Sequence, residues 1–146
     1  MSHETCGRVI IRSDRLRPFI ERHPWVRATA IEVVEGNPQD GSVVDVVSRQ
    51  GKFIARGIYN SQSQIRVRLY TWQDEPLDER FWRRRIEAAV ALREQLGMLT
   101  PHGAARLVFS ESDGLSGLII DRYRDFLVVQ VNSLGFQQRL ETIAGI

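Results

Sequence analysis

Hydrophobic and polar residues alternate in short runs through the first seventy residues. Five runs are rich in β-branched residues, at 8–12, 29–34, 42–48, 53–59 and 64–72. Turn residues separate them, notably the cluster at 36–41 and the pair Gln50-Gly51. Short runs divided by such turns are typical of strands in a small barrel or sandwich. In the run 64–72, Ile65, Val67 and Leu69 alternate with Arg66, Arg68 and Tyr70, which predicts a half-buried strand with a basic outer face.

Three segments carry a helical pattern. Asp14 is positioned to cap a short helix toward Arg22, with Leu16, Phe19 and Ile20 on its apolar side. Asp78 is positioned to cap a helix of about 18 residues that ends near Gly97. The run 136–146 begins an amphipathic helix and stops without a C-cap, so we expect the natural protein to continue.

The remaining segments of the second half are predicted to be strands. They are 106–111, 118–123 and 126–132, with Phe126, Val128 and in one interpretation Leu127 buried. Strands followed by helices without regular βαβ alternation indicate an α+β fold.

Charge is distributed unevenly along the chain. Residues 1–70 carry eleven basic against seven acidic side chains, and residues 71–146 carry nine against eleven. Lys52 is the one lysine, and all other basic residues apart from histidine are arginines. Arginine suits phosphates and base edges, although a codon bias toward arginine explains the composition equally well.

Catalytic and metal-binding patterns are absent from the sequence. His3, His23 and His102 lie far apart, and Cys6 has no base nearby in the sequence. The Gly114–Gly117 segment joins two predicted strands, whereas a phosphate-binding loop should lead into a helix. Glu111, Asp113 and Asp121 lie close to this hairpin. They fit positions in a turn or on the solvent-exposed face, and an acid–base pair is the alternative interpretation. We therefore expect no cofactor, no metal and no catalytic residue in this chain.

The sequence also predicts where the protein is located, from signals that it lacks. No apolar run reaches the length of a membrane span, and no secretory signal is visible. A single cysteine fits a reducing cytoplasm, so we expect a cytoplasmic protein without a membrane partner.

Basic and aromatic residues interleave between residues 12 and 72. Arginine and lysine neutralise phosphates, and aromatic rings stack on unpaired bases, so this pattern favours RNA binding. The candidate RNA-binding residues are Arg22, His23, Trp25, Arg27, Lys52, Arg56, Arg66 and Arg68. Trp25 also fits a core position, and Arg83–Arg85 fit a solvated helix face.

Five segments, in order, resemble one known family. They are Arg22–Val26, Gly51–Tyr59, Ser63–Arg68, Phe81–Ile86 and Glu111–Tyr123. Together they are similar to the PUA domain and the following segments of bacterial class I S-adenosylmethionine-dependent 23S ribosomal RNA cytosine-C5 methyltransferases, the large-subunit methyltransferase I family. Ser116 stands where the family usually has proline, which should loosen the turn.

The resemblance implies an organisation and a function. It implies a small mixed β pseudo-barrel of PUA type over residues 1–73, a linker and connecting helix over 74–100, and an incomplete strand-strand-helix module over 101–146. It further implies that this chain docks ribosomal RNA for a catalytic domain. That domain would bind S-adenosylmethionine and would lie outside this chain. Whether the chain counts as an enzyme is open, and we expect it to be inactive alone.

Two alternatives stay open at this point. One is a stand-alone RNA-binding or structural module with no enzymatic parent, which could also form a homodimer. The other is a small active site built around the three carboxylates.

Overall fold

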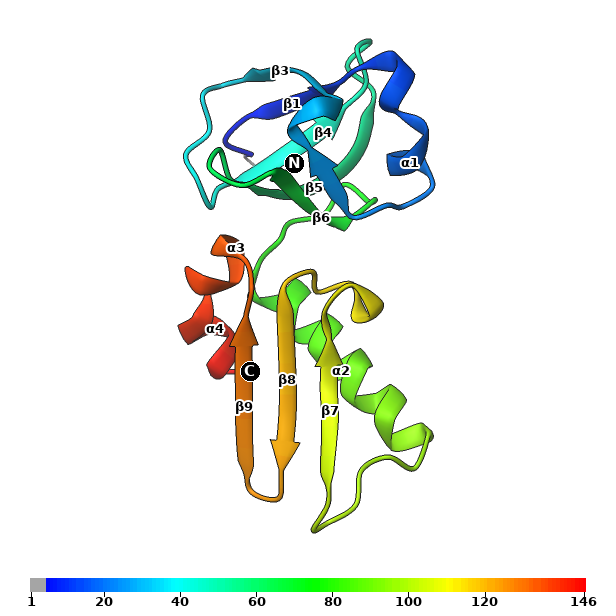
Figure 1. Ribbon diagram of the computed structural model, residues 1–146, viewed down its shortest axis with the longest axis vertical. Helices are drawn as coiled ribbons and strands as arrows, with labels where there is room; N and C mark the ends of the chain where they lie inside the picture. Colours follow the sequence, from blue (N-terminus) through cyan, green and yellow to red (C-terminus); the bar gives the residue numbers. More distant parts are fainter. Residues whose placement is uncertain (1–4) are drawn as a thin grey trace. The chain divides into compact units, whose positions relative to one another are not determined.

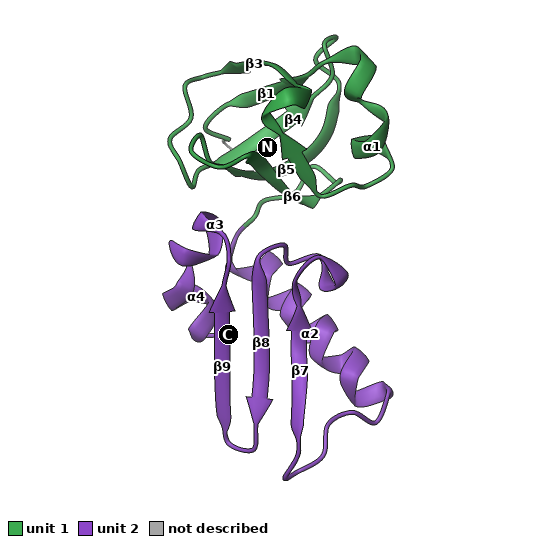
Figure 2. Ribbon diagram, viewed as in Figure 1, with its two compact units in different colours: residues 1–77 green, residues 78–146 purple. Residues whose placement is uncertain are grey.

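The computed structural model describes residues 5–146 and divides the chain into two compact units, residues 1–77 and 78–146 (Figures 1 and 2). His3 lies outside the described residues. The two units are described separately below.

The first unit is a six-stranded mixed sheet that curls into a half-barrel (Figure 1). Its strand order is β2-β6-β5-β4-β1-β3, and β1 runs parallel to β4 whereas the other neighbours are antiparallel. The strands are β1 (Arg8–Ile11), β2 (Trp25–Arg27), β3 (Ile31–Glu35), β4 (Val43–Val47), β5 (Phe53–Tyr59) and β6 (Ile65–Thr71). The helical turns are η1 (Ser13–Arg15), α1 (Arg17–Ile20) and η2 (Ala28–Ala30).

Valines dominate the core of the half-barrel. Val9, Val26, Val44, Val46 and Val67 are all fully buried, and Phe19 of α1 packs against them. β-Branched side chains pack well on a pleated sheet, which explains why these runs form strands rather than helices.

Local departures from the predictions have identifiable causes. Tyr70 is buried and not on the outer face of β6, because Arg56 pairs with Thr71 and Gly57 with Leu69, which leaves Tyr70 as the extra residue of a β-bulge. The predicted strand 29–34 begins later, at Ile31, after the turn η2. Ile20 is exposed, since α1 is a single turn that buries only Phe19.

The second unit is a three-stranded antiparallel sheet with helices. Its strand order is β7-β8-β9, and α2 packs against β7 (Figure 1). The elements are α2 (Glu79–Gln95), β7 (Ala104–Phe109), η3 (Ser110–Asp113), β8 (Leu118–Tyr123), β9 (Phe126–Val131), α3 (Leu134–Gln137) and α4 (Leu140–Ala144). The helix expected as a connector is grouped with this unit.

α2 begins where the sequence predicted. The Asp78 carboxylate accepts a hydrogen bond from the Phe81 backbone N–H at 2.9 Å, as an N-cap should. The buried face of α2 contributes Phe81, Trp82 and Ala89, and the Trp82 ring lies 5.3 Å from that of Phe136 in α3.

Predictions for the last twenty residues are confirmed in part. The run 136–146 is mostly helical, as predicted, but it is divided into α3 and α4 because Arg139 (φ −112°, ψ 13°) leaves the helical region. The predicted burial in β9 is wrong: Phe126, Leu127 and Val128 are exposed by 75%, 61% and 53%, because both faces of this edge strand are left largely uncovered within the described residues.

Candidate nucleic-acid interface

The candidate interface is the outer face of strands β2 and β6. Val26 and Val67 face the core and pair across the two strands. Since side chains alternate along a strand, Trp25 on β2 and its partner Arg68 on β6 project from the opposite face. The register then shifts: Arg27 pairs with Ile65, and Arg66 is the extra residue of a β-bulge beside the β5–β6 loop. The Leu69 N–H donates to the carbonyl of Pro24 at 2.8 Å, which holds the start of β2 against β6.

A stack of ring and guanidinium groups forms the first part of this face. Trp25 and Arg68 are directly paired, and the Arg68 Cζ lies 5.9 Å from the centre of the Trp25 ring. The His23 ring meets Trp25 edge-on, with 6.0 Å between ring centroids, and His23 Nδ1 accepts a hydrogen bond from the Trp25 N–H at 3.2 Å. Trp25 is half-buried, so it serves partly as packing and partly as surface.

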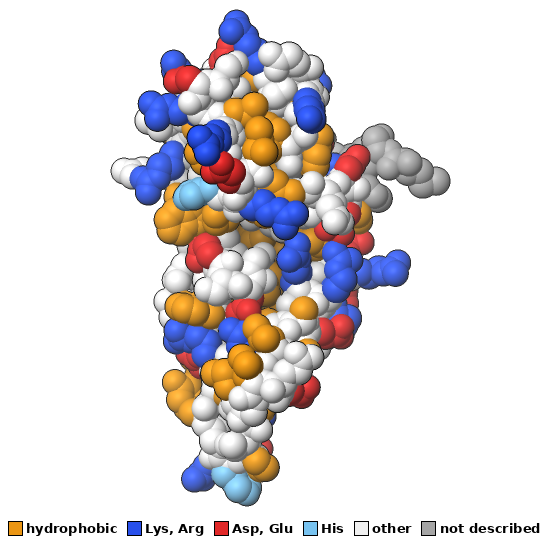
Figure 3. All heavy atoms as spheres, turned by 90° about the vertical axis from the view of Figure 1, so that its right-hand side faces the viewer, with side chains coloured by type: hydrophobic (Ala, Val, Ile, Leu, Met, Phe, Trp, Pro, Cys, Tyr) orange, Lys and Arg blue, Asp and Glu red, His pale blue; other side chains and the backbone are white. Residues whose placement is uncertain are grey.

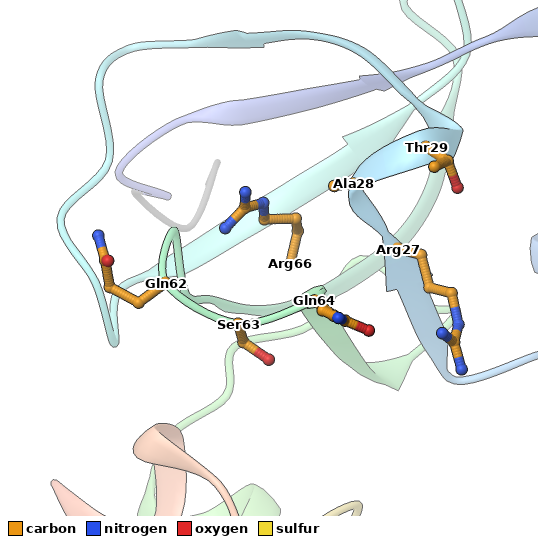
Figure 4. Close-up of a pocket in the computed structure, with 7 residues that line it drawn as sticks. All are labelled: Arg27, Ala28, Thr29, Gln62, Ser63, Gln64 and Arg66. Atoms are coloured by element: carbon orange, nitrogen blue, oxygen red, sulfur yellow. The ribbon is translucent and has the colours of Figure 1, made fainter.

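A pocket of about 300 Å³ forms the second part. It is lined by seven residues from the β2–η2 junction, the β5–β6 loop and β6, namely Arg27, Ala28, Thr29, Gln62, Ser63, Gln64 and Arg66 (Figure 4). Figure 4 shows the side chains of Arg27 and Arg66 pointing in different directions, with Ala28 and Gln64 drawn between them. The pocket therefore has a cation on either side rather than two converging on one point.

The two arginines of the pocket are uncompensated. Within residues 5–146, neither Arg27 nor Arg66 has a carboxylate partner. Most other exposed arginines of the same unit are paired, as Arg8 is with Glu35 at 2.8 Å and Arg17 with Glu21 at 2.8 Å. Lys and Arg side chains recur over this unit, with hydrophobic side chains between them (Figure 3). A free guanidinium beside a pocket can bind an anion without first breaking an ion pair.

Arg22 and Lys52 are exposed but stand apart from the pocket lining. Arg22 follows α1 in the left-handed region (φ 69°) and leads into His23. Lys52 lies in the β4–β5 turn, where its backbone N–H donates to Ser48 Oγ at 3.2 Å. Their placement in an RNA interface stays a prediction.

Arg56 is buried, with 2% of its surface exposed. Its guanidinium donates to Asp45 Oδ1 at 2.7 Å, to Asp74 Oδ1 at 2.7 Å and to the Glu75 carbonyl at 2.6 Å. Burial alone would lower the pKa of Arg56, but hydrogen bonds and charge from Asp45 and then Asp74 raise it above its ordinary value. These contacts join β4 and β5 to the segment after β6, so we leave Arg56 out of the proposed interface.

Thr29, Ser63 and Gln64 line the pocket but were not predicted as site residues from the sequence. They are neither charged nor aromatic, and only the pairing of β2 with β6 brings Thr29 near the β5–β6 loop. The polar run 61–64 is typical of any exposed loop and did not indicate a binding role.

The three carboxylates around the η3 turn have separate partners. Asp113 forms two hydrogen bonds with Arg93, at 2.6 and 2.8 Å, and its side chain is only 6% exposed. Asp121 pairs with Arg106, and Glu111 accepts a hydrogen bond from Ser116 Oγ at 2.7 Å. Carboxylates engaged in this way do not form an acid–base pair aimed at a substrate.

The Gly114–Gly117 segment does not have the strand-to-helix geometry of a Rossmann-like cofactor site. The Gly114–Gly117 segment runs from η3 into strand β8 and not into a helix. Gly117 has φ +92°, and a Cβ there would meet Ser133 at 2.7 Å, so close packing explains this glycine.

Two other site classes lack support in the described part of the chain. Among residues 5–146, no group of His, Cys, Asp or Glu side chains could hold a metal ion. Over the same range, no helix combines the length and apolar character needed to cross a membrane.

Comparison with known proteins gives a consistent result. A family model described as a PUA-like domain matches residues 9–72. Ribosomal RNA large subunit methyltransferase I of Tolumonas auensis is 44% identical over 140 residues, which cover 94% of this chain and 35% of that protein. The protein of the same name from Erwinia tasmaniensis is 41% identical, covering 95% of this chain and 36% of that protein. The chain thus spans about a third of the length of these curated relatives.

Solved structures agree on the fold. A crystal structure of a protein assigned as a methyltransferase, in complex with SAH, matches with a TM-score of 0.79 at 16% identity and covers 94% of this chain and 36% of that one. A second solved structure, of a Streptococcus mutans protein assigned as a SAM-dependent methyltransferase, matches with the same TM-score of 0.79 at 16% identity. The resemblance drawn from the five sequence segments is confirmed: residues 9–72 match the PUA-like domain model, and the chain is similar along almost its whole length to ribosomal RNA large subunit methyltransferase I.

Proposed function

We propose that this chain binds ribosomal RNA and docks it for a SAM-dependent cytosine-C5 methyltransferase reaction. The proposal takes the reaction and substrate class from the relatives, of which the chain spans about a third. It takes the docking role from the PUA-like domain and the face described above. The chain alone is expected to be catalytically silent and to act in the cytoplasm.

The observation that carries the docking role is the β2–β6 face. Arg27 and Arg66 have no carboxylate partner there, and Arg68 lies over the ring of Trp25. Unpaired guanidinium groups neutralise phosphates, while a ring backed by a guanidinium offers a stacking platform for a base. Neither feature contributes obviously to the core, which the valines on the other side of the same strands supply.

S-adenosylmethionine enters only as the methyl donor of the whole enzyme. The Gly114–Gly117 segment lacks the geometry of a Rossmann-like cofactor site, so we expect the cofactor and the catalytic groups to come from another part of the protein. No chemical step is assigned to any residue of this chain.

A salt titration of RNA binding tests the proposal. We expect the full chain to bind a single-stranded ribosomal RNA segment with an affinity that falls as salt rises. If about four phosphates are contacted, log affinity against log salt has a slope near −3. Arg66→Ala with Arg68→Ala should weaken binding at least tenfold and leave the circular dichroism and melting temperature unchanged.

Arg8→Ala is the matched control, because Arg8 is exposed but paired with Glu35 on the β1–β3 side of the sheet. Binding that ignores salt, or that survives the double change, would overturn the docking role. A chain that binds RNA while no methyltransferase activity accompanies the full-length protein would favour the alternative of a stand-alone RNA-binding module.

A homodimer is a second candidate, favoured by one observation on β9. This edge strand exposes Phe126, Leu127 and Val128, and exposed apolar edges pair readily with other chains. A second copy pairing through β9 would cover them. Val128→Lys should then abolish a concentration-dependent dimer in sedimentation, whereas a strict monomer at high concentration would refute it.

A further inference from the structure

We propose that the pocket between the β2–η2 junction and the β5–β6 loop binds a single unpaired ribonucleotide of the RNA, with its flanking phosphates on Arg27 and Arg66. The proposal rests on the RNA-binding function above and specifies what that surface recognises. It assigns a role to Thr29 and Gln64, which no sequence pattern indicated.

The placement of the two cations sets the number of phosphates. Arg27 and Arg66 line the same pocket, yet their side chains point in different directions (Figure 4). One phosphate held by both would need converging guanidinium groups. Two cations on either side of a pocket instead match two successive phosphates of an extended strand, with the nucleoside between them.

The polar groups between the cations suit a ribose. Within residues 5–146, the Thr29 hydroxyl and the Gln64 amide have no hydrogen-bond partner. Ser63 Oγ accepts a hydrogen bond from the Ile65 N–H at 3.1 Å and keeps its own hydrogen to donate. A 2′-hydroxyl is both donor and acceptor, and these three side chains offer both functions.

The volume and the neighbouring platform favour a single strand. About 300 Å³ is the lower end of small-ligand sites, which is enough for one nucleoside and too little for a base pair. Trp25 lies two residues before Arg27, about 7 Å along the strand. A second base could therefore stack beside Trp25 and Arg68 while the first occupies the pocket, an arrangement that a duplex does not permit.

The test compares three labelled probes by fluorescence anisotropy with the full chain. They are a uridine hexaribonucleotide, the deoxyuridine hexamer and an RNA duplex. We expect the ribonucleotide hexamer to bind at least tenfold more tightly than the deoxy hexamer, and the duplex to compete poorly.

Two sets of variants separate the contribution of the polar side chains from that of the two arginines. Thr29→Val with Gln64→Ala should weaken binding of the ribonucleotide but not the deoxy hexamer, so that the ratio of affinities approaches one. Arg27→Ala with Arg66→Ala should weaken both and reduce the magnitude of the salt slope by about 1.4 for single strands. The controls are Gln50→Ala and Arg8→Ala, which change exposed residues outside the pocket, with melting curves recorded for every variant.

The outcomes distinguish this inference from the function on which it rests. Salt-dependent binding of RNA and DNA with equal affinity overturns the ribonucleotide pocket and leaves RNA docking standing. A Thr29/Gln64 variant that is folded and keeps the wild-type preference also overturns the pocket. Absence of binding to every nucleic acid overturns both.

Discussion

Replacement of Arg56 by alanine should destabilise the first unit severely. Asp45 is the main loss, because its side chain is 19% exposed and would be left as a charge without its cation. Removing one partner of a buried ion pair typically costs about 3–5 kcal/mol. Asp74 adds at most about 1 kcal/mol, since its side chain is 68% exposed and water replaces the pair there.

This cost is large against the stability of the unit. A folded unit of 77 residues typically has a free energy of unfolding of about 4–12 kcal/mol. The substitution would therefore remove about a quarter or more of it. Arg56→Lys should recover only part, because one ammonium cannot reproduce the planar fork that reaches Asp45, Asp74 and the Glu75 carbonyl together.

Urea denaturation of the full chain measures the effect, with tryptophan fluorescence from Trp25 and Trp72 and amide hydrogen exchange to resolve the two units. Arg66→Ala is the matched control and should leave the midpoint unchanged. The reasoning fails if Arg56→Ala keeps the wild-type midpoint. If that variant is folded and selectively loses RNA binding, Arg56 contacts RNA directly, as the sequence alone suggested.

Three other substitutions test separate parts of the structure. The hydrogen bond from Arg106, opposed in part by burial, lowers the pKa of Asp121. The ion pair therefore stabilises the fold above about pH 4–5, and this stabilisation is lost as pH falls through the lowered pKa. Arg106→Gln should return the pKa of Asp121 toward its ordinary value in an NMR titration, and an unchanged titration would contradict this cause. Asp113→Ala leaves Arg93 unpaired and the Phe109 N–H without its acceptor, so the second unit should lose about 3–5 kcal/mol in denaturation, whereas a loss below 1 kcal/mol would argue against a structural pair. Gly57→Ala would push a Cβ into the Arg68 carbonyl across β5 and β6, costing about 1–3 kcal/mol, and unaltered exchange of the β6 amides would show that the strands adjust freely.

Sequence alone predicted the elements whose signals are local. The Asp78 cap is visible in the chain because its acceptor and donor lie three residues apart. The runs 53–59 and 64–72 were placed within a residue of β5 and β6. The signal was the Gln50-Gly51 turn before the first run and period-two alternation in the second. Five ordered segments then identified the family, which no single element could do.

Features that depend on distant partners were beyond the sequence. The burial of Tyr70 follows from a bulge that exists only because β6 pairs with β5 in one register. The exposure of Phe126 depends on what packs over the faces of β9, and both faces of this strand are largely uncovered within the described residues. An apolar residue in a strand looks the same in the sequence whether a neighbour covers it or not.

The arginines of the candidate site are another feature whose role depends on distant partners that the sequence does not reveal. Period-two alternation predicted that Arg66 and Arg68 share one face, and it treated Arg56 as an equivalent residue. In the structure Arg68 pairs with Trp25, Arg66 is the extra residue of a β-bulge, and Arg56 is buried. What separates Arg56 from Arg66 is the presence of carboxylates: Arg56 is held by Asp45 and Asp74, whereas Arg66 has no carboxylate partner within residues 5–146. A bias toward arginine codons explains how many arginines the chain has, but not why unpaired ones line the same pocket. That clustering is a property of the fold, so the pocket, rather than the composition, is the stronger argument for RNA binding.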